Sequence, residues 1–200
     1  MKSIGIAVSF LTVFGSHAAQ AHIVGSRLGD FYAGALHPLT GLEDVILWTA
    51  MGVLAGTQPS NRARWLVLLF PAGLLAGLAL GLATGFGAGT TIVDAGLMVA
   101  LGSLLALAVR LPGPVLHVAA LSLAIVRGAA NAGGIAPQDN VVLFAAGFTV
   151  AGYAVITLTM AMTLAFRLPD QGWRTVTLRA AGSWVAAIGI MIGGFALRAV

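Results

Sequence analysis

Short runs of turn residues divide this chain into about six apolar segments, most of them long enough to cross a lipid bilayer. Only 8% of the 200 residues are charged, whereas a soluble domain carries about 25%, so this chain could not cover a water-facing surface. We therefore predict an all-α membrane protein, a bundle of about six transmembrane helices. The segments are residues 38–56, 65–83, 92–109, 115–132, 141–166 and 177–197.

The first 21 residues have the three parts of a cleavable signal peptide. Lys2 supplies the positive charge, residues 4–14 form the apolar core, and Ala19-Gln20-Ala21 matches the small-residue cleavage motif. The apolar core is shorter than the roughly 20 residues of a membrane span, which favours a cleaved signal over an uncleaved first helix. We expect two parts: the signal peptide, residues 1–21, and a single six-helix transmembrane domain, residues 22–200.

The mature chain would begin at His22, where a free α-amine next to an imidazole could chelate a metal ion. An exposed N-terminal histidine without a function is the other interpretation. Between His22 and the first apolar segment, residues 22–36 carry apolar side chains at helical spacing, which predicts a short helix in the membrane interface.

The basic residues predict the orientation of the bundle. Arginines occur in the loops after the first, third and fifth apolar segments, whereas the second and fourth loops contain no Lys or Arg. Loops rich in Lys and Arg stay in the cytoplasm. We therefore expect a multi-pass protein of the bacterial inner membrane with a periplasmic mature N-terminus, as a cleaved signal requires. The arginines are Arg62, Arg64, Arg110, Arg167, Arg174 and, at the edge of the last segment, Arg179.

Polar side chains are placed at the periplasmic ends of three apolar segments. Ionisable residues inside apolar segments are costly, and they usually mark a functional site. Because all of these polar side chains lie at the periplasmic ends of their segments, we predict that they converge at one depth, which random scatter over distant parts of the chain would not produce. The residues are His37, Glu43 and Asp44 in the first segment, Asp94 in the third, and Arg127 and Asn131 in the fourth.

Imidazole and carboxylate groups suit borderline divalent metals such as nickel, cobalt and zinc. On an ideal helix His37 and Asp44 share a face but lie roughly 10 Å apart along the axis. One ion could then contact both only if the helix bends, for example at Gly41, or if His37 folds back from a preceding loop. Alternatively, Glu43 or Asp44 complements the positive end of the helix dipole.

Arg127 requires a different account, because a guanidinium is always charged and cannot bind a metal. We expect a structural ion pair between Arg127 and Asp94, Glu43 or Asp44. Three carboxylates and one arginine would still leave a negative pocket, which favours a cation as the substrate.

Residues 37–44, His-Pro-Leu-Thr-Gly-Leu-Glu-Asp, resemble the His-Pro-x-x-Gly-x-Asp-His motif of the HupE/UreJ family of nickel and cobalt permeases. In that family the motif opens the first mature helix, directly after a cleaved signal. Weaker matches follow in the family's order over the whole chain. They are residues 93–96 (Val-Asp-Ala-Gly), 110–112 (Arg-Leu-Pro), 147–148 (Gly-Phe), 179–182 (Arg-Ala-Ala-Gly) and Gly189.

The chain departs from the family pattern at most of the family's histidines. Glu43 and Asp44 stand where the family has Asp and His. Arg127 and Asn131 stand where the family's His-Gly-x-Ala-His-Gly motif has its two histidines, and Ile156 replaces a later one. Sites rich in oxygen hold harder ions and bind nickel less selectively. Two interpretations therefore stay open: this chain carries another cation, or it has lost transport.

The resemblance implies a permease that takes a divalent transition-metal cation, nickel or cobalt, from the periplasm. The metal site would use His37, Glu43, Asp44, Asp94 and His22, and Arg127 and Asn131 would have a structural or gating role. The alternative is a membrane accessory protein that assists assembly of a hydrogenase or urease without transporting the metal.

Other classes of function receive little support from the sequence. The chain contains no Cys and no phosphate-binding G-x-x-x-x-G-K-[ST] motif, so thiolate sites and direct use of ATP are excluded. Its basic residues form no patch for nucleic acid. We expect no enzyme activity and no cofactor, because neither Ser103 nor Ser183 has a nucleophile motif. The expected partners are the bilayer and the metal ion, and a homo-oligomer is left open.

Overall fold

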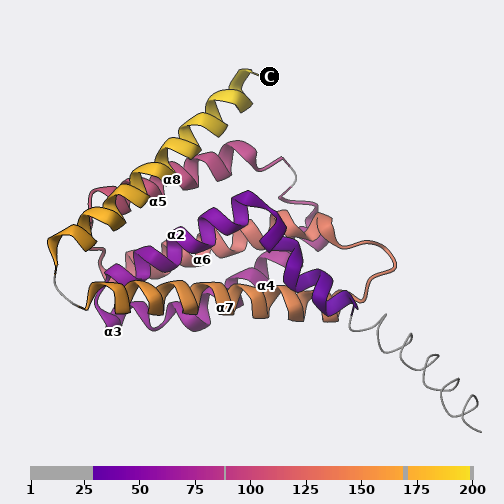
Figure 1. The fold of residues 1–200 in the computed structure, drawn as a ribbon. Helices are drawn as coiled ribbons and strands as arrows, with labels where there is room; N and C mark the ends of the chain where they lie inside the picture. The colour runs from indigo at the N-terminus through magenta and orange to yellow at the C-terminus, as the bar shows by residue number, and fades with distance from the viewer. Residues whose placement is uncertain (1–28, 88, 169–170, 199–200) are drawn as a thin grey trace, which may run out of the picture.

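The computed structural model describes residues 29–87, 89–168 and 171–198, and they form helices joined by short turns (Figure 1). The predicted class, an all-α membrane protein, is confirmed. The signal peptide and His22 lie outside the described residues. The elements are the helix Gly29–Thr40, α2 (Leu42–Thr57), α3 (Ser60–Ala63), α4 (Leu66–Thr84), α5 (Thr91–Ala106), α6 (Gly113–Asn131), the short 3₁₀ helix η1 (Ala132–Gly134), α7 (Val141–Arg167) and α8 (Gly172–Arg198).

Four stretches of the described chain are long and apolar enough to cross a membrane: Ser60–Thr84, Gly113–Gly134, Val141–Arg167 and Gly172–Arg198. A fifth is counted if the helix Gly29–Thr40 and α2 form one bent span. α5 is apolar but has only 16 residues, which gives a length of about 24 Å, below the roughly 30 Å of a hydrocarbon core. The protein is therefore multi-pass, and the described residues do not confirm the predicted count of six spans.

The first apolar segment begins differently from the prediction. Pro38 was expected at the start of a long helix, but it lies in the last turn of the helix Gly29–Thr40, and α2 begins only at Leu42. The two helices meet at an angle of 80°. Gly41 separates them with an extended backbone (φ −89°, ψ 120°), so the helical hydrogen bonding is interrupted there. The bend turns His37 away from the axis of α2.

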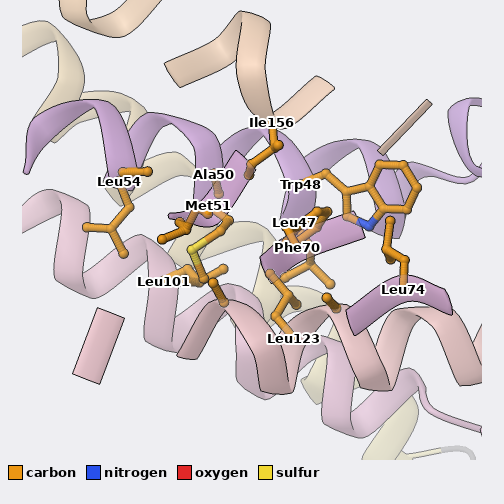
Figure 2. Close-up of a cluster of buried hydrophobic side chains, with 14 of the residues drawn as sticks. Leu47, Trp48, Ala50, Met51, Leu54, Phe70, Leu74, Leu101, Leu123 and Ile156 are labelled. Carbon is orange, nitrogen blue, oxygen red and sulfur yellow. The ribbon is translucent and has the colours of Figure 1, made fainter. Parts of the chain in front are cut away.

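The helices pack mainly as three pairs: α2 with α7, α4 with α6, and α5 with α8. α4 also contacts α7, and α2 contacts α5, so the pairs form one bundle. Its core contains Trp48 of α2, whose ring meets Phe70 of α4 edge to face at 5.9 Å and Phe148 of α7 at 5.6 Å. Figure 2 shows Trp48 and Phe70 beside Leu74, with side chains from α5, α6 and α7 completing the cluster.

α8 is held differently from the other long helices, because it packs mainly on α5 and buries little of its length (Figure 1). The contact depends on small residues. A Cβ atom at Gly182 would lie 2.5 Å from Leu105 Cβ and 2.6 Å from the backbone nitrogen of Ala106. Glycine therefore allows the two backbones to approach closely, as is common between membrane helices.

The basic loops lie together at one end of the bundle, where α2, α5 and α7 end. Arg62 donates to the carbonyl oxygen of Leu111 at 2.9 Å, which joins two of these loops. Two further arginines bond carbonyl groups in the last turns of neighbouring helices: Arg167 donates to Gly56 O at 3.0 Å and Arg179 to Ala106 O at 2.8 Å. A cation at a helix C-terminus is favoured by the helix dipole.

Candidate functional site

The end of the bundle opposite the basic loops contains a buried ion-pair network that joins three helices. Arg127 of α6 donates through Nε to Asp44 Oδ1 of α2 at 2.7 Å. The same guanidinium reaches Asp94 Oδ2 of α5 through Nη1 at 2.6 Å. The predicted convergence of polar groups thus includes Asp44, Asp94 and Arg127, and the ion pair expected for Arg127 forms with two of the three candidate carboxylates.

Asn131 and Thr90 complete this network. Asn131 lies one turn after Arg127 on α6, so the two side chains share a face of that helix. Its Nδ2 donates to Asp44 Oδ2 at 3.0 Å and to the carbonyl oxygen of Arg127 at 2.8 Å. Thr90, directly before α5, donates through Oγ1 to Asp94 Oδ2 at 2.8 Å. Thr90 was not among the predicted site residues, although side chains four residues apart at a helix start lie on the same face and can bond one another.

Local helix chemistry explains where the two acids stand. Asp44 and Asp94 lie in the first turns of α2 and α5, where the helix dipole favours negative charge. Neither helix has a side-chain cap at its N-cap residue. The dipole interaction expected for Asp44 is therefore compatible with its position, and both of its carboxylate oxygens, like Oδ2 of Asp94, accept bonds from other side chains.

The network is buried, so each of its charged groups needs a partner. Asp44, Asp94, Arg127 and Asn131 are each at most 6% exposed. Charges in such a place are tolerated only when they are paired and hydrogen-bonded. One atom departs from this rule, because Asp94 Oδ1 is buried and has no hydrogen-bond partner in the described part of the chain. This oxygen is free to accept a bond from a ligand.

His37 and Glu43 lie beside the network but outside its hydrogen bonds. Both side chains are half-buried. The imidazole of His37 packs against the ring of Phe144 on α7, at a centroid distance of 5.8 Å, and also contacts Gly134 of η1. Glu43 directly precedes Asp44 in the first turn of α2. Both side chains are therefore partly accessible at the end of the bundle that contains the buried acids.

No three of the described His, Asp and Glu residues are close enough together to hold a metal ion in this arrangement. The structure brings Asp44 and Asp94 together through Arg127, and His37 and Glu43 remain separate. With two carboxylates around one guanidinium, the ionised network carries one excess negative charge. Chemically it can attract a cation, provided that the cation competes with Arg127 for carboxylate oxygens.

Three of the four positions at which the chain lacks a histidine of the resembled pattern meet in space. Asp44, Arg127 and Asn131 stand in place of family histidines, and all three belong to the same hydrogen-bonded network. Ile156, the fourth such position, is fully buried on α7 in the apolar core. At these three positions the acid, the arginine and the amide bond one another, and Asp94 Oδ1 is the network's buried oxygen without a partner among the described residues.

Comparison with known proteins adds an independent line of evidence. The family model described as HupE / UreJ protein matches residues 10–192. Protein HupE of Rhizobium leguminosarum bv. viciae is 29% identical over 173 residues, which cover 86% of this chain and 87% of that relative. No solved structure matches the chain.

Proposed function

Since this chain belongs to the HupE/UreJ family of membrane proteins, we propose that it is an inner-membrane permease for a divalent transition-metal cation. The cation enters from the periplasmic side, at the end of the bundle that holds Asp44 and Asp94. Nickel and cobalt are the substrates that the family resemblance implies. Because the site offers more oxygen than nitrogen donors, manganese belongs among the ions to be tested.

The free oxygen of Asp94 is the observation that carries this proposal. Asp94 Oδ1 is buried without a partner among the described residues, while Oδ2 of the same carboxylate is held by Arg127 and Thr90. A buried carboxylate oxygen without a partner is costly, and a cation that binds it would recover that cost. The net negative charge of the Asp44–Arg127–Asp94 network supports the same sign of ligand.

In this mechanism His37 and Glu43 receive the ion at the surface and Arg127 acts as the gate. His37 lies in the last turn of the helix Gly29–Thr40, before the bend at Gly41, so a change in the bend angle would move its imidazole relative to α2. A cation that approaches Asp94 displaces the positively charged Arg127 from it by repulsion and competition. Because Arg127 joins α2, α5 and α6, its displacement would loosen three helices together and allow the ion to move inward.

The second candidate is an accessory membrane protein that assists a metalloenzyme without transporting the metal. Its support is the pairing of Asp44 with both Arg127 and Asn131, which leaves that carboxylate no free oxygen. A permanently closed network would fix the three helices as a rigid scaffold. The two candidate functions differ in one requirement: only a permease needs the ion pairs of Arg127 to open.

The test is accumulation of nickel, cobalt, zinc, copper and manganese in cells that express the chain. The variants are His37→Ala, which removes the imidazole, and Asp94→Asn, which keeps the shape of the side chain but removes its charge. Arg64→Gln, at the opposite end, is the control for loss of a charge. All four proteins are compared at equal abundance in the membrane.

We expect the wild type and Arg64→Gln to raise the cell content of one metal and the other two variants to abolish the increase. If the wild type accumulates none of the five metals, the permease proposal is rejected for these ions. A partner protein that then copurifies with the wild type would favour the accessory function.

A further inference from the structure

A second polar hollow lies at the opposite end of the bundle, among the basic loops. Three arginines line it: Arg110 from the α5–α6 loop, Arg167 from the end of α7 and Arg179 from α8. Thr57 and Thr175 add hydroxyl groups to its wall, and its volume is about 240 Å³. No His, Asp or Glu lines the hollow. Its chemistry therefore favours an anion, the opposite of the acidic site.

Two of these arginines also bond helix ends, but these bonds use only a few of their N–H donors. Arg167 donates one hydrogen bond to Gly56 O, and Arg179 donates one to Ala106 O. A guanidinium has five N–H donors. The ion pairs between described residues both belong to Arg127, so the three arginines have no carboxylate partner in that part of the chain. Most of their N–H donors therefore have no hydrogen-bond partner among the described residues.

A groove with the opposite character adjoins this basic hollow. It is lined by Val53 of α2, by Met162 and Phe166 of α7, and by Leu178 of α8, and its volume is about 400 Å³. Its lining surface is almost entirely apolar. Leu178 lines both the groove and the basic hollow, so the two lie on either side of this residue. The groove exists because α8 packs mainly on α5 and only weakly on α2 and α7.

The apolar groove lies deeper along the helices than the basic hollow. Val53 lies one turn before Thr57 on α2, and Thr163 lies one turn before Arg167 on α7. In both helices the residue that lines the groove is nearer the middle of the bundle than the residue that lines the basic hollow. The groove therefore extends from the arginines towards the hydrocarbon region.

We propose that this composite hollow binds an anionic phospholipid from the leaflet that faces the basic loops. Its phosphate would lie among Arg110, Arg167 and Arg179, and an acyl chain would occupy the groove beside Leu178. Planar guanidinium groups bind phosphate oxygens in pairs, and basic pockets between membrane helices accept lipid headgroups. The apolar groove distinguishes a lipid from a free phosphate ion, which would leave that surface uncovered. The bound lipid would fill the gap between α8 and the α2–α7 pair.

The proposal is tested by titrating the purified full chain in detergent with phosphatidylglycerol, phosphatidylcholine or inorganic phosphate. Native mass spectrometry counts the bound molecules. Arg110→Gln is the main variant, because this side chain is exposed and its loss leaves the bonds to Gly56 and Ala106 intact. Arg64→Gln is the matched control, with the same change of charge at the same end but outside the hollow. Thr177→Trp fills the groove from the exposed side of α8.

We expect one tightly bound phosphatidylglycerol on the wild type and on Arg64→Gln. Arg110→Gln should bind it about fivefold more weakly, which corresponds to about 1 kcal/mol for one arginine. Thr177→Trp should also weaken it while the protein stays monodisperse. The proposal would be overturned if Arg110→Gln and Arg64→Gln weakened phosphatidylglycerol binding equally. It would also be overturned if the wild type bound phosphatidylcholine as tightly as phosphatidylglycerol. Inorganic phosphate that binds lipid-free protein as tightly, and is lost in Arg110→Gln, would assign the hollow to the free ion instead.

Discussion

Arg127 donates to Asp44 across a 2.7 Å Nε–Oδ1 distance, although 83 residues separate them in the chain. This bond connects the first turn of α2 with the last turns of α6, in a region where both side chains are almost inaccessible. A buried ion pair contributes little net stability, because desolvation of the charges offsets much of their attraction. Its main consequence is a constraint on Arg127, because loss of this side chain would leave the buried carboxylates of Asp44 and Asp94 without a counter-charge.

We predict that Arg127→Gln strongly destabilises the folded protein. The substitution leaves Asp44 and Asp94 buried without a counter-charge, and loss of one partner of a buried pair costs about 3–5 kcal/mol. Asp44→Asn should cost less, because its amide oxygen can still accept the bond from Arg127. The measurement is unfolding of the purified protein in mixed micelles. Similar unfolding curves for the wild type and Arg127→Gln would mean that the acids bind protons or other partners instead.

The double variant Asp44→Asn/Arg127→Gln measures the interaction energy between the two side chains apart from their contacts with other residues. If the two residues act on each other, the cost of the double variant is smaller than the sum of the single costs, with a coupling of about 0.5–3 kcal/mol. Additive costs would show that the 2.7 Å contact carries no interaction energy. Arg64→Gln, which lies far from the network, provides the control for an additive effect.

A second prediction concerns the metal preference of the site. Asp44, Arg127 and Asn131 stand where the resembled family pattern has histidines, and they meet in one network. Changing all three to His should raise nickel or cobalt binding, because imidazole is a better ligand than oxygen donors for these ions. Asp44→His alone should fail, since Arg127 would remain as a positive charge beside the ion. Calorimetric titration of both variants with nickel decides between these outcomes.

The positions of most helices could be predicted from the sequence. The segment 141–166 became α7 (Val141–Arg167), and 65–83 became α4 (Leu66–Thr84), because turn residues flank both apolar runs. The helix of the last segment, α8, begins at Gly172, five residues before the predicted 177, because its first turns include polar residues such as Arg174 and Thr175. Apolar periodicity does not mark a helix start in a polar, interfacial stretch.

The arrangement of the site was only partly predictable. The sequence placed Asp94 and Arg127 at the same end of the bundle, because that prediction needs only the direction in which each helix crosses the membrane. The choice of Asp44 over Glu43 as the partner of Arg127 depends on the rotation of α2, which its packing against α7 and α5 sets. The 80° bend at Gly41 was considered, but nothing local required it, because Gly41 has an extended backbone that any residue can adopt.

A third prediction tests how α8 is attached. Gly182→Leu should detach α8 from α5, because a Cβ atom there would lie 2.6 Å from the backbone nitrogen of Ala106. Overpacking of this kind costs about 1–3 kcal/mol. Gly194→Leu is the matched control on the same helix, since a Cβ atom there meets nothing within 4 Å. A disulfide introduced between α5 and α8 reports the contact, and equal cross-linking of the two variants would contradict the prediction.

The final prediction tests the orientation of the bundle, and the absence of cysteine from the chain makes it direct. Gln138 and Gln171 are both exposed, in the α6–α7 and α7–α8 connections at opposite ends. Because the basic loops should face the cytoplasm, a membrane-impermeant thiol reagent added to intact spheroplasts should label Gln138→Cys and leave Gln171→Cys unlabelled. After lysis both should react. The reverse pattern would place the acidic network on the cytoplasmic side, and the direction of metal entry proposed above would then be wrong.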